Sequence, residues 1–387
     1  MARLAVSVCL CLLWSLGAAW VPSHSTDRST RLNAELRPGS LEAATAELGR
    51  VPYGEASRKY RRTVYSHKDW VRHRSNNRLV ENVRGMFISG VIRQLQREIA
   101  LIASVATFCV VWNDLLVPSN DMLPHLCLPM LPFTLSSPAL GLLLVFRTNA
   151  SYQRWLEARM RWGVIVAQSR NAVRMASTFA DLREDGREAL DELATAVWAT
   201  ARSIMNKLAG PEDELEYQRE LQDAYPSQPG LVQRLVDSPD RSASALMQAS
   251  LVLDRIPVDE KRRVETDKSL AIMGDTISAC DKIFTSPVPL VYTRHTARFL
   301  TIWMLLLPFA IHDEFIKADA SGLPTIPASA VLALFLFGIE ELAIQLEEPF
   351  SILPMQKLCD EIRSVTKGLI DWSEASQVED AKVKALK

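Results

Sequence analysis

The chain has 387 residues, of which 48% are hydrophobic and 23% are charged, and its formal net charge is −1. This apolar share is high for a wholly soluble protein and the charged share is high for one lying wholly in a membrane, so the apolar residues are expected in separate runs. A net charge near zero gives no support for nucleic acid as a partner.

Residues 1–19 have the pattern of a signal peptide. Arg3 is their only charge, an apolar stretch follows it, and Gly17-Ala18-Ala19 is a small-residue cleavage pattern. Residues 20–50 are then interpreted as a transit-like leader rich in Ser, Thr and Arg, followed by a linker marked by Pro and Gly. The two parts together resemble the bipartite plastid leader of algae with secondary plastids. The alternative is a secreted or plasma-membrane protein with a polar N-terminal tail.

Residues 51–97 are expected to form a basic membrane-proximal segment. Between Arg58 and Arg97 the sequence holds eleven Lys or Arg residues against two acids, Asp69 and Glu81. Basic residues next to a span favour the side from which the span was inserted. The segment is therefore predicted to lie on the inner side of a membrane.

Four apolar runs in the remaining chain are predicted to be membrane-spanning helices. The second run carries no charge, and at about 1.5 Å per residue it extends roughly 31 Å, which is close to the thickness of a bilayer core. The two later runs are short, so flanking helical turns must extend them. The predicted spans are 99–117, 126–146, 299–311 with extensions, and 324–341.

The long segment 147–298 between the second and third spans is predicted to be a helical soluble body on the inner side. It is rich in Ala, Leu, Arg, Glu and Gln and lacks the alternating pattern of strands. A polar tail, 373–387, follows the main body of the chain, 98–372. The expected fold class is all-α, with about four spans and a helical soluble domain.

No catalytic motif is found in the sequence. Motifs of phosphate-binding loops, nucleophile elbows, zinc proteases and dinucleotide sites are missing, and the histidines are scattered. His312-Asp313-Glu314 contains metal-ligand residue types, but three consecutive residues rarely converge on one ion, so no metal site and no enzyme are expected.

Two pairs of carboxylates lie near the inner end of the fourth predicted span. Acidic residues at such a place are interpreted as structural ion-pair partners for arginines of a neighbouring helix. They are Glu340, Glu341, Glu347 and Glu348.

Several short motifs recur in order along the chain. They are Leu131-Pro-Phe-Thr-Leu135, Leu144-Val-Phe-Arg-Thr-Asn-Ala-Ser-Tyr-Gln-Arg-Trp155, Ser286-Pro-Val-Pro-Leu-Val-Tyr-Thr293 and Glu347-Glu-Pro-Phe-Ser351. Together they resemble the bestrophin family over roughly 60–372, and most of all its plant and algal branch of thylakoid voltage-dependent chloride channels and bestrophin-like bicarbonate channels. The resemblance implies a homopentamer of mostly helical subunits around a central pore that the second span lines.

The resemblance places the hydrophobic neck of the pore at Leu131, Leu135 and Ala139. These residues are spaced i, i+4, i+8 and therefore share one helix face. The alternative is that this face packs against other helices. A ring of apolar side chains would control ion passage by wetting and dewetting.

Positive charge near the neck is needed to favour anions over cations, and three residues are candidates for it. Arg147 follows the second span directly, although it is equally interpreted as an ion-pair partner of the Glu340/Glu341 region. The family's inner constriction is expected within 256–264, where Lys261 and Arg262 add positive charge.

The calcium site of animal members is not expected in this chain. The corresponding residues, 352–357, include no carboxylate, and Ca²⁺ requires oxygen ligands. No cofactor is therefore expected.

The function expected from the resemblance is a chloride channel of a plastid membrane, the thylakoid, with passive voltage-dependent flux that balances charge and tunes the proton-motive force. Chloride, nitrate or bicarbonate, further copies of the chain and the bilayer are the expected partners. One alternative is a bicarbonate channel that supplies the thylakoid lumen in a carbon-concentrating mechanism. Another is a non-conducting membrane assembly or scaffold protein.

Overall fold

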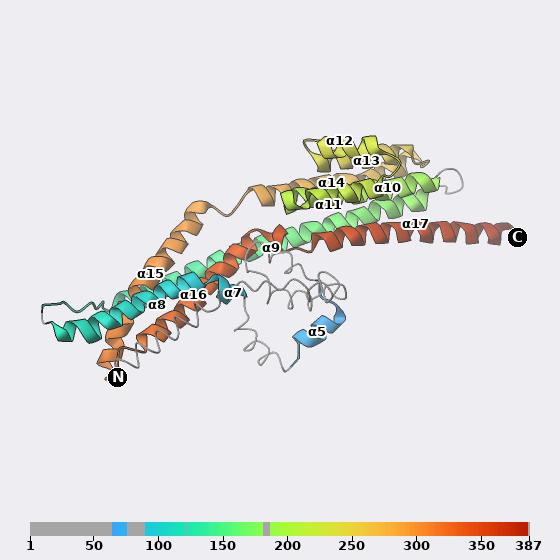
Figure 1. Cartoon of the computed structure of the whole chain (residues 1–387). Helices are drawn as coiled ribbons and strands as arrows, with labels where there is room; N and C mark the ends of the chain where they lie inside the picture. The colour runs from blue at the N-terminus through green and yellow to red at the C-terminus, as the bar shows by residue number, and fades with distance from the viewer. Residues whose placement is uncertain (1–63, 76–89, 121, 181–185, 386–387) are drawn as a thin grey trace, which may run out of the picture.

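A computed structural model describes residues 64–75, 90–120, 122–180 and 186–385 of the chain (Figure 1). The predicted signal peptide 1–19, the leader 20–50 and most of the basic segment 51–97 lie outside these residues. Every regular element in the described part is a helix, which confirms the all-α class.

The helices fall into a membrane group and a soluble group joined by one long helix, α9. In chain order they are α5 (His67–His73), α7 (Gly90–Gln94), α8 (Gln96–Val111), η2 (Trp112–Leu116), η3 (Val117–Ser119), α9 (Leu131–Phe179), α10 (Gly186–Ala209), η4 (Pro211–Asp213), α11 (Glu214–Ala224), α12 (Pro229–Asp237), α13 (Arg241–Arg255), α14 (Glu260–Thr285), α15 (Leu290–Lys317), α16 (Thr325–Glu347), η5 (Pro349–Ser351) and α17 (Met355–Ala385).

Four helical stretches in the described residues are long and apolar enough to cross a membrane, as the sequence predicts. They are Gln96–Ser119, Met130–Phe179, Leu290–Lys317 and Thr325–Glu347. The third stretch extends the short apolar run by about two helical turns at each end. The first continues from α8 through a π-helical turn and a 3₁₀ turn, η2 and η3.

The second span starts later than the apolar run suggested. Residues 126–130 are not helical, and α9 begins at Leu131 with a proline in its first turn. Proline is favoured in the first helical turn because its missing N–H has no partner there, whereas Pro129 disfavours helix in the residue before it. Absence of charge therefore marked the apolar run correctly but did not mark the first residue of the helix.

Helix α9 is the element that both groups share. It has 49 residues, or roughly 73 Å at the rise of an α-helix. Its first part packs with α15 and α16, and its second part packs with α10, α14 and α17 (Figure 1). The residues of α9 therefore lie along a single helix that runs from the membrane group into the soluble body.

Each group of helices has its own apolar core. In the membrane group the core is formed by residues of α8, α9, α15 and α16, among them Ile102, Leu140, Leu144 and Met304. The larger core of the soluble body surrounds the second half of α9, where Trp162 is completely buried. Burial of apolar side chains therefore holds one side of α9 in the membrane group and in the soluble body.

The C-terminal segment 373–387, expected as a polar tail, is helical as far as Ala385 and belongs to α17. Ser373 Oγ donates a hydrogen bond to the Ser177 carbonyl at 2.8 Å, and Gln377 donates to the Ala180 carbonyl at 3.2 Å. These bonds pair the last carbonyls of α9, which have no partner within their own helix. Polar composition therefore did not indicate a separate tail.

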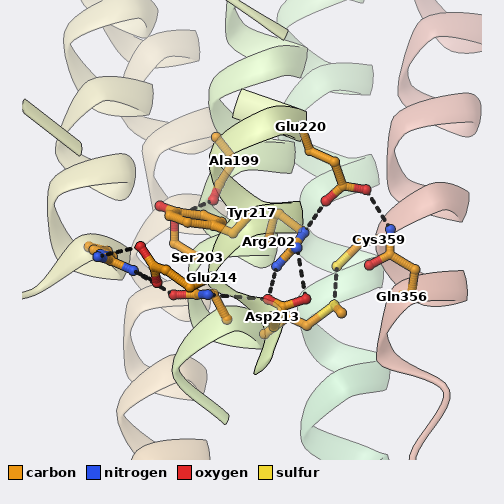
Figure 2. A network of polar contacts seen from close by, with 12 residues as sticks. Ala199, Arg202, Ser203, Asp213, Glu214, Tyr217, Glu220, Gln356 and Cys359 are labelled. Atoms are coloured by element: carbon orange, nitrogen blue, oxygen red, sulfur yellow. Dashed lines mark hydrogen bonds and ion pairs between the residues drawn. The ribbon is translucent and has the colours of Figure 1, made fainter. Parts of the chain in front are cut away.

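A buried arginine on α10 links four elements of the soluble body (Figure 2). The Arg202 side chain is fully buried and donates two hydrogen bonds to the Asp213 carboxylate, at 2.6 and 3.0 Å. It also donates to Glu220 of α11, whose other oxygen accepts from Gln356 of α17 at 2.8 Å. Because both carboxylates lie against one guanidinium, the charge of Arg202 is compensated inside the fold.

Tyr217 of α11 extends this network from Arg202 toward Arg241. The guanidinium groups of Arg202 and Arg241 each lie 5.3 Å from the centre of its ring. Burial raises the pKa of Tyr217, and the hydrogen bond from Arg241 lowers the pKa of Glu214. Tyr217 is therefore neutral and Glu214 is charged at physiological pH.

We predict that Arg202→Met destabilises the protein by about 3 kcal/mol, because Asp213 and Glu220 would keep their charges without the cation that compensates them. The measurement is the midpoint of thermal unfolding in detergent. Arg219→Met is the matched control, since Arg219 is exposed on α11 and has no ion pair with any described residue. Equal midpoints for the two variants would contradict the structural role of Arg202.

Candidate functional site

The first half of α9, which lies in the membrane group, leaves one apolar face uncovered. Leu131 and Leu135 are 66% and 71% exposed, and Ala139 is exposed as well. The opposite face, with Leu140 and Leu144, is buried in the membrane core. The three residues predicted to form the neck thus lie together on a surface that a single copy of the chain does not cover.

The same face of α9 continues into the soluble half with a different character. Because an α-helix turns about 100° per residue, Gln153 and Met160 lie on the same side as Leu135. They border a surface hollow of about 530 Å³ together with Arg154 and Arg161. We call this continuous surface, Leu131–Leu135–Ala139–Gln153–Met160, the uncovered face of α9.

The charge along the inner part of α9 is strongly positive. Between residues 147 and 179 the helix carries six arginines and one acid, Glu157. Arg161 donates a hydrogen bond to Glu157 at 3.1 Å, and both side chains are nearly half exposed. An apolar stretch at the outer end therefore leads to a basic stretch at the inner end.

Arg147 does not point along the uncovered face. It is 5% exposed, and its Nη1 donates to Glu340 Oε1 of α16 at 2.5 Å. A charge this deeply buried is tolerated because its partner lies beside it. Of the two interpretations of Arg147, the geometry is that of an ion pair between α9 and α16.

The other three glutamates near the end of α16 make different contacts. Glu341 is buried and accepts a hydrogen bond from Gln345 at 2.7 Å. Glu347 offers its backbone carbonyl to Arg154, and the Glu348 carbonyl accepts from Ser351. The Glu340 carboxylate is the one that forms the ion pair with Arg147 and so joins α16 to α9.

Arg154 is a residue whose role the sequence did not reveal. It donates to the carbonyls of Ile283 and Ser286 at 2.7 Å each, and to that of Glu347 at 3.0 Å. These carbonyls end α14 and α16, where backbone acceptors lack helical partners and carry partial negative charge. The available signal was its spacing, two helical turns after Arg147.

Lys261 and Arg262 lie at the start of α14, far from the neck residues. Both are exposed; Arg262 pairs with Asp259 at 3.0 Å, and its guanidinium lies 4.9 Å from the Phe179 ring at the end of α9. Along α9, Phe179 lies roughly 66 Å from Leu135. The structure thus places these cations at the opposite end of the molecule, and their role at an inner constriction stays a prediction.

The residues considered for metal binding do not converge. His312 Nε2 forms a hydrogen bond with Asp114 Oδ1 of η2, at 2.9 Å, instead of facing its neighbours Asp313 and Glu314. Asp313 instead pairs with Lys317 at 2.7 Å. In the part of the chain that the structure covers, no three His, Cys, Asp or Glu side chains are grouped as ligands.

Comparison with known proteins identifies the family. The family model described as bacterial/fungal bestrophin protein matches residues 69–367. The chain is 30% identical over 312 residues to voltage-dependent chloride channel 1, chloroplastic, of Arabidopsis thaliana, covering 80% of this chain and 73% of that protein. It is 28% identical over 329 residues to voltage-dependent chloride channel 2, chloroplastic, of the same plant, covering 83% and 76%.

The solved structures agree with this at the level of fold. A bacterial bestrophin homologue from Klebsiella pneumoniae matches with a TM-score of 0.60 and 21% identity, covering 70% of this chain and 97% of that one. The chain belongs to the bestrophin family. The relatives named here are ion channels and not enzymes.

We predict that Glu340→Gln destabilises the protein by about 3 kcal/mol, because the buried Arg147 would lose its counter-charge. Replacing both partners, as Arg147→Met with Glu340→Leu, should restore most of the loss because no buried charge remains. Thermal unfolding of the purified variants in detergent measures both effects.

Glu361→Gln is the control for this pair, since the ion pair between Glu361 and Arg170 is exposed and should contribute less than about 1 kcal/mol. A double variant no more stable than Glu340→Gln alone would show that Arg147 and Glu340 do not act as a pair.

Proposed function

We propose that the chain forms a homopentameric anion channel that passes chloride passively and in a voltage-dependent manner. The observation that carries the proposal is the uncovered face of α9, which runs from exposed apolar residues to a basic hollow. Five copies of this face around one axis would form a passage with an apolar neck. The names of the Arabidopsis relatives support chloride as the ion.

The neck would act as a gate and the basic stretch would choose the sign of the ion. Leu131, Leu135 and Ala139 offer no replacement for hydration water, so ions pass only when the ring is wetted, and weakly hydrated anions lose least. The arginines of inner α9 raise the local positive potential, which attracts anions and repels cations. The side chain of Ala139 is small, so the third ring is the widest of the three.

The membrane we propose is the thylakoid. The relatives are named chloroplastic, and the N-terminal sequence has the composition of a bipartite plastid leader. Anion entry into the lumen in the light would dissipate the electrical part of the proton-motive force. Nitrate and bicarbonate share the charge of chloride and are the other permeant ions we expect.

Single-channel recording in a planar bilayer tests the proposal, with chloride replaced by nitrate, bicarbonate or gluconate. We expect anion-selective currents with chloride and nitrate permeant. A permeability for bicarbonate above that for chloride would favour supply of bicarbonate to the lumen. Absence of current from a correctly inserted sample at all voltages would favour a non-conducting scaffold and contradict the channel.

We predict that Leu131→Ala together with Leu135→Ala raises conductance or open probability by roughly threefold or more, because smaller side chains make the ring easier to wet. Ile302→Ala is the matched control, since Ile302 is an exposed apolar residue of α15 and lies outside the uncovered face. Unchanged currents in the double variant, or an equal rise in the control, would contradict the neck at these residues.

A further inference from the structure

A pocket of about 840 Å³ lies where the inner ends of the membrane helices meet the soluble body. Its lining comes from four segments of the described chain. They are α5 with the residues just before it, the middle of α9, the end of α16, and the stretch 352–361 that leads into α17. The side chains that matter here are Trp70 of α5, Trp155 and Arg159 of α9, Leu342 and Leu346 of α16, and Lys357 of α17.

The level of this pocket relative to the membrane follows from the register between α9 and α16. The two helices run side by side in the same direction, since Arg147 bonds Glu340 and Arg154 bonds the Glu347 carbonyl. Leu342 and Leu346 therefore lie at the inner end of a membrane span. Arg159 lies five residues past Arg154, roughly 7 Å further along α9, which is about the depth of one headgroup layer.

The lining changes from apolar to cationic along the same direction. Leu342 is 46% exposed and lines the pocket near the end of the span. Trp70 is half exposed, and the Trp155 ring stacks on Tyr152 with their centres 5.9 Å apart. Tryptophan at the level of lipid headgroups is typical of membrane proteins because the ring is apolar and its N–H is polar.

Arg159 provides a charge without a counter-charge. It is exposed, and neither a hydrogen bond nor an ion pair joins it to any described residue. The acid of the pocket, Glu361, is bonded to Arg170. A guanidinium binds phosphate or sulfonate oxygens through two parallel hydrogen bonds, and it does so more strongly beside apolar surface than in open water.

We propose that this pocket binds an anionic membrane lipid. The acyl chain lies along Leu342 and Leu346, and the phosphate or sulfonate of the headgroup contacts Arg159 between Trp70 and Trp155. The apolar floor favours a lipid over a free anion of the same charge. The site is separate from the uncovered face of α9, and binding does not depend on whether the protein conducts.

Native mass spectrometry of protein released from nanodiscs of equal phosphatidylglycerol and phosphatidylcholine tests the site. We expect the unchanged protein to retain phosphatidylglycerol in preference, and Arg159→Gln to retain about fivefold less. Arg159→Lys should keep part of the preference because it keeps the charge but not the paired hydrogen bonds. Arg174→Gln is the control, being an exposed arginine of α9 about 22 Å further from the membrane.

A second measurement locates the lipid. Phosphatidylglycerol with brominated chains should quench the fluorescence of Trp155, so that the quenched part of the emission falls in Trp155→Phe and also in Arg159→Gln. Glycerol 3-phosphate should not displace the lipid, because it has the headgroup charge without the chain.

Three results would overturn the proposal. They are equal retention of the two lipids by the unchanged protein, equal retention by Arg159→Gln and the parent, and displacement by glycerol 3-phosphate. Each is independent of any current, so failure here would leave the channel proposal standing, and a silent channel would leave the lipid site standing.

Discussion

Two arginines of α9, Arg147 and Arg154, hold this helix against α16. The first places a buried charge beside Glu340, and the second binds the carbonyls that end α14 and α16. In a low-dielectric setting an unpaired charge or carbonyl is costly, so these contacts fix both the rotation and the axial position of α9. The face of the helix that carries Leu131, Leu135 and Ala139 is then left uncovered, and the function proposed for the protein depends on that face.

The length of α9 connects the membrane with the soluble body mechanically. Its outer half is covered on one side by the membrane core, and its inner half by the core that contains Trp162. The network around Arg202 stiffens the helices that pack on this inner half (Figure 2). A lipid held at Arg159 would lie at the junction of the two halves, where α9, α16 and α17 meet.

The sequence predicted the fold class and the four spans because runs without charge are a direct requirement of the bilayer. It did not predict that α9 starts at Leu131, because helix starts depend on local proline geometry and capping and not on apolarity. Polar residues at the C-terminus indicated a tail, whereas Ser373 and Gln377 make contacts with the end of α9 that lie nearly two hundred residues away in sequence.

Part of the candidate site could also be predicted from the sequence. Spacing along one helix placed Leu131, Leu135 and Ala139 on a common face, since it depends only on helix geometry. The partner of Arg147 could be narrowed to Glu340 or Glu341 but not chosen, because the choice depends on the register between α9 and α16. The carbonyls bound by Arg154 carry no mark in a sequence, since every residue has one.

The most direct test of the account is whether water and ions reach the uncovered face of α9. In a Cys127→Ser background, which removes the exposed thiol of the described chain, Leu135→Cys and the buried Leu144→Cys are each treated with a charged methanethiosulfonate reagent during bilayer recording. Current that changes on modification of Leu135→Cys but not of Leu144→Cys is the predicted result. Current unaffected at position 135, or changed equally at both positions, would contradict the claim that this face lines the ion passage.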